Sequence, residues 1–307
     1  MAEQGLVGEG VSGLDLPLGY RVELPGRGTT FVRDVEGPSA DAPVVVLLHG
    51  WMASGGLNWF GAFESLSAHF RVIAPDLRGH GRGIKGWRRF RLSDCADDVA
   101  ALLAALEVPG AIVCGYSMGG PVAQLMWRRH PELVHGLVMA ATSASFIPGL
   151  QQRMAFAGVM AAAAGGTRTG QVLMRVPLWP QRFVPFRPGQ RPSSLQRWAS
   201  QEFRRHDMRM VFEAGNAIAA FSSRRWIGQV DVPTTVVVTT KDRAVNPSEQ
   251  IRLALSIPDA EIQRYPEGHI APVTDSFGPA MTEACLSVHE RIVADGTPRR
   301  ERHLRSV

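Results

Sequence analysis

A serine flanked by glycines is the strongest candidate for chemistry in this 307-residue sequence. Residues 115–120, which read GYSMGG, follow the apolar run AIVC and open a segment with helical periodicity. In that context G-x-S-x-G indicates a sharp turn from a strand into a helix, with a strained serine at its tip. Small neighbours let the two backbones approach closely. We predict that Ser117 is a nucleophile; the alternative is an incidental glycine–serine turn.

A serine hydroxyl needs a base to accept its proton, and the base needs an orienting acid. Among nine histidines, His269 stands in a short glycine-containing loop directly after the strand-like run EIQRYP, and Asp242 directly follows TTVVVTT. Both residues should therefore lie at the carboxyl edge of a parallel sheet, where ligands bind in open α/β folds. We expect Ser117, Asp242 and His269 to meet there. A turn or helix-capping role is the alternative for Asp242.

The sequence also offers two backbone donors for an oxyanion. The run His49-Gly50-Trp51 ends the strand-like segment VVVLLHG, so the N–H of Trp51 can converge with the N–H of Met118. Each such donor typically contributes about 3 kcal/mol of transition-state stabilisation. The alternative is a plain turn at the strand end, and we expect His49 to be structural in either case.

A second glycine motif points to no cofactor. Residues 81–86, GRGIKG, satisfy G-x-G-x-x-G, but WRRFRLSD separates the third glycine from the next helical segment. A bound phosphate would then miss the helix N-terminus, so we expect no nucleotide site. The histidines and the three cysteines lack metal-like spacing, and we expect no metal or other cofactor.

Composition limits the class of protein. Apolar residues make up 45% and charged residues 20% of the chain, which excludes disordered, collagenous and coiled-coil proteins. The first residues lack a basic stretch and an apolar core, and the three cysteines are scattered and odd in number. We therefore expect a reduced, cytoplasmic location.

The net charge of +5 is unevenly distributed. Residues 151–228 hold twelve arginines against three acids. Coding bias toward arginine on a solvated surface is one interpretation. The other is a basic lid that faces anionic head groups, acyl carriers or a membrane surface, with weak membrane association. The arginines are not interleaved with a recognisable nucleic-acid motif, so nucleic-acid binding is not expected.

The surrounding elements alternate between strands and helices. We expect strands at 20–24, 30–35, 44–48, 72–75, 111–115, 137–141, 235–239 and 261–265. Several are continuous apolar runs, typical of parallel strands covered on both faces. Val99, Leu102, Leu103 and Leu106 mark a helix with Ser93 as its expected N-cap, and further helices follow GYSMGG and contain Met281. This alternation predicts a mostly parallel sheet with helices on both faces.

The alternation breaks for more than 80 residues, too many for a loop inside a compact domain. We predict a core formed by residues 19–142 and 229–295 and a helical cap, or lid, at 143–228. A flexible N-terminal arm (1–18) and a basic C-terminal tail (296–307) should flank them. The cap contains a methionine- and phenylalanine-rich stretch, MAFAGVM, which would suit apolar ligands or pack the lid onto the sheet.

The chain order Ser117, Asp242, His269, with HG before the serine and the cap between serine and acid, resembles the α/β-hydrolase superfamily over roughly residues 20–295. PDLRGHGRG at 75–83 looks like that family's loop after its fourth strand. The resemblance implies an eight-stranded, mostly parallel sheet with a lid after the sixth strand. Some relatives place the acid after that sixth strand, but no Asp or Glu follows here until Glu202.

The resemblance further implies serine-dependent acyl transfer, with Ser117 as nucleophile, His269 as base, Asp242 as orienting acid, and Trp51 and Met118 as oxyanion donors. Serine at the turn disfavours the dehalogenase and epoxide-hydrolase chemistries, which use a carboxylate. We expect a small-molecule acyl substrate, an ester or thioester with a largely apolar acyl group. C–C bond hydrolysis with the same triad, and a slow-turnover ligand receptor, are the alternatives. The sequence does not specify an oligomeric state.

Overall fold

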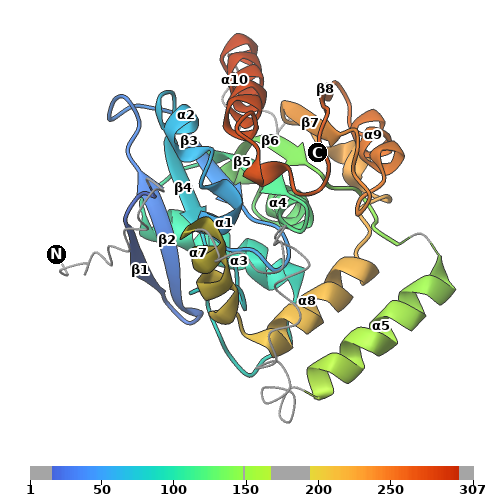
Figure 1. The fold of residues 1–307 in the computed structure, drawn as a ribbon. Helices are drawn as coiled ribbons and strands as arrows, with labels where there is room; N and C mark the ends of the chain where they lie inside the picture. The colour runs from blue at the N-terminus through green and yellow to red at the C-terminus, as the bar shows by residue number, and fades with distance from the viewer. Residues whose placement is uncertain (1–15, 148, 167–193, 297–307) are drawn as a thin grey trace.

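Figure 1 shows the computed structural model, which describes residues 16–147, 149–166 and 194–296. Eight strands form one sheet in the order β1-β2-β4-β3-β5-β6-β7-β8. The two pairings of β2 are antiparallel and the remaining pairings are parallel. The strands are β1 (Gly19–Leu24), β2 (Gly28–Val35), β3 (Val44–Leu48), β4 (Arg71–Pro75), β5 (Ala111–Tyr116), β6 (Val134–Ala140), β7 (Thr234–Thr239) and β8 (Glu261–Tyr265). The predicted eight-stranded, mostly parallel sheet is confirmed.

Apolar side chains on both faces of the central strands explain why helices cover the sheet on two sides. In β3, Val45 and Leu47 join one core cluster, whereas Val46 and Leu48 join the other. The first cluster also contains residues of α1 (Gly55–Trp59), α2 (Phe63–Ser67) and α10 (Phe277–Asp295). The second contains residues of α3 (Leu92–Ala105), α4 (Gly119–Arg129) and α9 (Pro247–Leu255). The strands lie between these two layers (Figure 1).

One local prediction was wrong. Helix α3 begins at Leu92 with Arg91 at its N-cap, so Ser93 lies inside the helix and does not cap it. Leu92 is buried, and beginning the helix there places this side chain on the core face. Asp94 does lie in the first turn, where a negative charge interacts favourably with the helix dipole.

Among the described residues, three α-helices follow β6 and precede β7. They are α5 (Leu150–Gly165), α7 (Ser194–Arg204) and α8 (Met208–Ala220), and α5 and α8 lie side by side in Figure 1. Ser223 draws the two ends of this insertion together, because its N–H donates to Ala144 O at 2.9 Å. Its hydroxyl also donates to Gln124 Oε1 of α4, at 2.6 Å. The insertion is thus fastened to the helix that follows Ser117.

Parts of the expected domain layout lie outside the described residues. These are residues 1–15 of the arm, residues 148 and 167–193 of the cap, and residues 297–307 of the tail. Within the described ranges, every helix is too short or too polar to cross a bilayer.

Candidate active site

Ser117 lies at the turn between β5 and α4, at the carboxyl edge of the sheet. Its φ is +51°, in the left-handed region that residues with a side chain rarely adopt. Its N–H donates to Ala140 O at 2.9 Å, and its C=O accepts from Thr142 Oγ1 at 2.9 Å. A Cβ on Gly115 would collide with the backbone of Gly119, so the tight turn requires glycine there. These contacts hold a mostly buried serine in a strained backbone conformation.

His269 lies in the loop between β8 and the short helix η4 (Ala271–Val273). Its Nε2 is 3.0 Å from Ser117 Oγ, within hydrogen-bond distance. The hydroxyl of Tyr116 donates to the backbone carbonyl of His269 at 2.9 Å. The residue immediately before the serine thus holds the histidine loop, a contact that sequence reasoning missed because nothing in GYSMGG identifies its partner.

Asp242 completes the set on the far side of the imidazole. Its Oδ2 is 2.8 Å from His269 Nδ1, and its Oδ1 accepts the N–H groups of Ala244 and Val245 at 2.8 and 2.9 Å. Burial pushes the pKa of the Asp242 carboxyl upward. The hydrogen bond and charge of His269, together with donors including Val245 N–H and Thr239, outweigh burial and bring that pKa below its ordinary value. Asp242 therefore stays ionised and fixes the orientation of the imidazole.

Two further residues support the carboxylate. Thr239 Oγ1 donates to Asp242 Oδ2 at 2.8 Å. Gln250 of α9 donates from Nε2 to Thr239 Oγ1 at 2.9 Å and to Val245 O at 2.8 Å, and its Oε1 accepts from Thr239 N at 3.0 Å. Sequence reasoning missed both residues. Gln250 could have been found from its spacing, because it lies on the same helix face as the buried Leu253 and Ala254. An amide on an apolar face needs polar partners.

Gly50 of the HGW run lies against the serine, directly before the Trp51 N–H that we expect to be an oxyanion donor. A Cβ on Gly50 would lie 3.3 Å from Ser117 Cβ, so the backbone at Gly50 packs directly against the nucleophile. Gly50 N–H itself donates to Asn58 Oδ1 at 2.9 Å. Within the described part of the chain, the N–H groups of Trp51 and Met118 have no acceptor. Met118 is also the N-cap of α4, where the helix dipole favours negative charge.

His49 is a structural residue. It is fully buried; its Nε2 accepts the N–H of Leu77 at 2.9 Å and its Nδ1 lies 2.8 Å from Gly50 O. Burial lowers its pKa to about 3, so the ring is neutral near pH 7 and holds the loop that carries the Trp51 N–H.

The inserted helices are joined to the loops around Ser117 by buried polar contacts. The indole Nε1 of Trp51 donates to Val211 O of α8 at 2.7 Å. Glu202 of α7 is fully buried; its carboxylate pairs with Arg82 at 3.0 Å and accepts from Ser54 Oγ at 2.9 Å. Sequence reasoning missed these roles, because the partners lie far apart in the chain.

Backbone amides of the glycine motif at 81–86 hydrogen-bond to protein side chains. Gly81 N–H donates to His206 Nδ1 at 2.9 Å, and Arg82 N–H donates to Asp76 Oδ2 at 2.8 Å. Two amides that a phosphate would need are therefore already bonded to protein acceptors.

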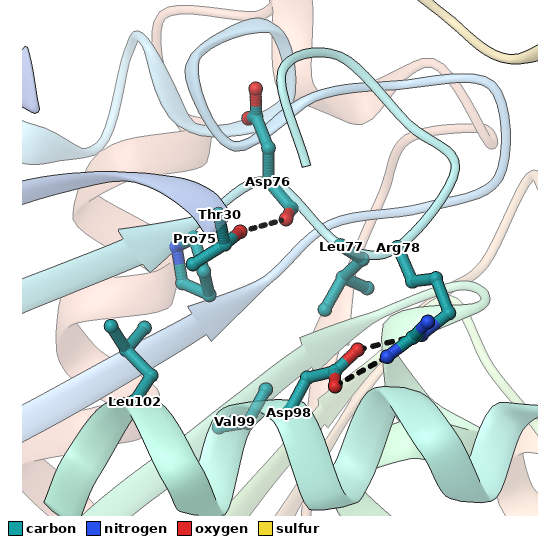
Figure 2. Close-up of a pocket in the computed structure, with 8 residues that line it drawn as sticks. All are labelled: Thr30, Pro75, Asp76, Leu77, Arg78, Asp98, Val99 and Leu102. Atoms are coloured by element: carbon teal, nitrogen blue, oxygen red, sulfur yellow. Dashed lines mark hydrogen bonds and ion pairs between the residues drawn. The ribbon is translucent and has the colours of Figure 1, made fainter. Parts of the chain in front are cut away.

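A small pocket lies away from this site, between β2 and α3 (Figure 2). It is lined by Thr30, Pro75, Asp76, Leu77, Arg78, Asp98, Val99 and Leu102. Asp98 pairs there with Arg78 at 2.7 Å and with Arg27 at 2.6 Å, which satisfies the carboxylate within the protein. The lining includes neither Ser117 nor His269, so this pocket has no part in the chemistry of the triad.

Comparison with known proteins assigns the family. Residues 43–276 match the family model described as the alpha/beta hydrolase fold. A pimeloyl-[acyl-carrier protein] methyl ester esterase of Chromobacterium violaceum is 31% identical over 239 residues, which cover 75% of this chain and 88% of that protein. The chain belongs to the α/β-hydrolase family, and it is a hydrolase related to esterases.

Other similarities are shorter or more distant. The esterase of the same name from Nitrosospira multiformis is 33% identical over 109 residues, which span 35% of this chain and only 41% of that relative. A crystal structure of a hydrolase from Pseudomonas aeruginosa superimposes with a TM-score of 0.69 at 25% identity. That match covers 87% of this chain and 97% of the other.

Proposed function

We propose that the protein hydrolyses carboxylic esters through a covalent acyl-enzyme on Ser117. The observation that carries this proposal is the continuous hydrogen-bonded series Ser117–His269–Asp242. Relatives named as methyl ester esterases support ester cleavage over the C–C bond hydrolysis that the same three residues can also perform.

In the proposed reaction, Ser117 Oγ bonds to the acyl carbon while His269 Nε2 takes the hydroxyl proton. The carbonyl oxygen becomes an oxyanion that accepts the N–H groups of Trp51 and Met118. Collapse of this intermediate breaks the ester C–O bond, and the departing alcohol takes the proton from His269. Water then gives a proton to the same nitrogen and attacks the acyl carbon. Collapse releases the carboxylic acid and returns the proton to Ser117.

The substrate we propose carries a largely apolar acyl group. On α5, Met154 and Val159 are 67% and 63% exposed, and Met160 lies against α8 near Gly215. Flexible thioether side chains accommodate varied apolar ligands. Three further apolar residues of the predicted cap, Leu173, Met174 and Phe183, lie outside the described residues.

The test uses the full chain with a p-nitrophenyl ester series of increasing acyl length, matched thioesters, a β-diketone and a fluorophosphonate probe. We expect ester turnover and probe labelling that both disappear in Ser117→Ala, with a loss of at least about 10³-fold in kcat. Ser67→Ala removes the hydroxyl of a half-buried residue on α2 and should change neither. Labelling that persists in Ser117→Ala contradicts the proposal, as does diketone cleavage in the absence of ester turnover.

A further inference from the structure

A strongly exposed tryptophan stands in the loop between β4 and α3. Trp87 is 90% exposed, whereas Ile84 and Phe90 on either side of it are buried at 4% and 2%. Tryptophan is among the more buried residue types on average. The fold therefore anchors both sides of this loop in the core and turns its largest apolar side chain outward. We call residues 85–91 the basic loop.

Cations surround the indole. The basic loop carries Lys85, Arg88, Arg89 and Arg91 and no acid, and all four side chains are on exposed residues. In the portion of the chain that the structure describes, no acid pairs with Arg88, Arg89 or Arg91. By contrast, several described cap arginines are already paired with acids: Arg205 with Glu202, Arg209 with Glu213 and Arg224 with Glu249. Three arginines without an acidic partner in the described residues, and Lys85, thus lie within four residues of Trp87.

The basic loop is held in place by the inserted helices. Lys85 Nζ donates to Arg205 O at the end of α7, at 2.7 Å, and Phe90 N–H donates to Glu213 Oε2 of α8, also at 2.7 Å. Arg209 donates to Gly86 O. These bonds fix the loop at both ends against the cap, so the indole and the arginines form a defined surface.

We infer that the basic loop is a docking surface for an anionic lipid bilayer. An indole suits the boundary between head groups and acyl chains, and each Lys or Arg near an anionic surface contributes about 1 kcal/mol. A protein partner would need a larger apolar centre. None of the other large apolar side chains found exposed in the described residues belongs to this loop. This inference does not depend on the esterase activity.

The test is co-sedimentation of the full chain with vesicles of phosphatidylcholine containing about 30% phosphatidylglycerol, against pure phosphatidylcholine. We expect retention on the anionic vesicles at about 50 mM salt and release at about 500 mM. Replacing Arg88, Arg89 and Arg91 by Gln should weaken binding about a hundredfold, or about fivefold per arginine. Brominated lipid should quench a fluorescence component that Trp87→Phe lacks.

The matched control replaces Arg21, Arg225 and Arg264 by Gln; all three are exposed, and no acid pairs with them in the described residues. It removes the same charge and should bind within about twofold of the wild type. Unchanged thermal midpoints would show that every variant folds. The inference is overturned if the wild type stays in solution, or if both triple variants lose binding equally. It is also overturned if a single-stranded oligonucleotide or an acidic protein, and not the vesicles, binds through these arginines.

Discussion

Ser117 keeps a backbone conformation that costs about 1–3 kcal/mol, because several neighbours fix it. Ser117 N–H donates to Ala140 O and Ser117 O accepts from the Thr142 hydroxyl, and these two hydrogen bonds hold the turn in its strained conformation. The resulting geometry directs Oγ at His269, so local strain is the origin of the site. The same logic, in which a neighbour fixes a reacting residue, applies to the histidine and the acid.

Tyr116 positions His269 through a backbone contact. Burial raises the pKa of its hydroxyl well above the ordinary value, so the group remains a donor at working pH. Tyr116→Phe should lower kcat about tenfold with little change in KM, because the histidine carbonyl loses its partner and the loop can shift. Tyr265→Phe is the matched control, since its hydroxyl bonds Thr274 and Ser276 instead. Equal kcat losses in both variants would contradict the positioning role.

Asp242, which accepts a hydrogen bond from Thr239, contributes to the stability of the fold in a pH-dependent way. The pKa of Asp242 is lower in the folded protein than its ordinary 3.8. Its ionised form therefore stabilises the fold above about pH 4, and this contribution is lost as pH falls through the folded pKa. Thr239→Val removes one donor to the carboxylate and should reduce the free energy of unfolding by about 1.5–3 kcal/mol at pH 7.

The difference in free energy of unfolding between the wild type and Thr239→Val should become smaller below about pH 4. There the Asp242 carboxyl is protonated and no longer requires the donor. A smaller part of that difference should remain at every pH, because Thr239→Val also loses the hydrogen bond from Gln250. Thermal midpoints across the acid range measure both parts. A gap that stays constant from pH 7 to the acid limit would show that Thr239 does not act through the charge of Asp242.

At the scale of elements, apolar runs predicted the sheet well, because each strand carries its own pattern. Strands β3 and β8 have the predicted bounds, and β7 begins one residue early. The largest error is at β6, which begins at Val134 and not at residue 137. His135 and Gly136 interrupt the apolar run, and only the pairing with β5 reveals that these residues continue the strand.

Helix α8 shows what such patterns cannot predict. Gly215 lies inside this helix, where alanine normally stabilises by about 1 kcal/mol. A Cβ there would stand 2.9 Å from Trp51 Cζ2 and 3.1 Å from Met160 Sδ. The glycine therefore makes room for the indole of Trp51, the residue that follows Gly50 beside Ser117. The requirement comes from a residue more than 160 positions earlier, so no local pattern contains it.

Gly215→Ala should consequently destabilise the protein by about 1–3 kcal/mol and lower kcat, because Trp51 must move. Gly158→Ala in α5 is the matched control, since a Cβ there meets no atom within 4 Å. That change should stabilise by up to about 1 kcal/mol and leave kcat unaltered. Thermal midpoints and ester turnover of the two variants decide the matter. Stabilisation by both alanines would mean that Trp51 does not need the space.

For the molecule as a whole, the meeting of Ser117, Asp242 and His269 was predictable, because parallel strands bring their carboxyl ends to one edge. The attachment of the inserted helices could not be predicted in this way. Glu202 bonds Arg82 across 120 residues and Ser54 across 148 residues. A charged residue in a helical segment is ordinarily assigned to the surface. Only the folded arrangement shows that this carboxylate is buried.

The Glu202–Arg82 pair should therefore be a principal link between cap and core. Glu202→Ala should reduce the free energy of unfolding by about 3–5 kcal/mol, because it leaves the buried Arg82 guanidinium without its carboxylate. Arg82→Ala should have a similar effect. The double variant should lose clearly less free energy of unfolding than the sum of the two single variants, since each single change already breaks the pair.

Arg252→Ala, in an exposed pair with Glu249, is the control and should change the free energy of unfolding by less than about 1 kcal/mol. Urea unfolding of the four variants measures the coupling, and additive losses would show that the cap is held to the core by other contacts.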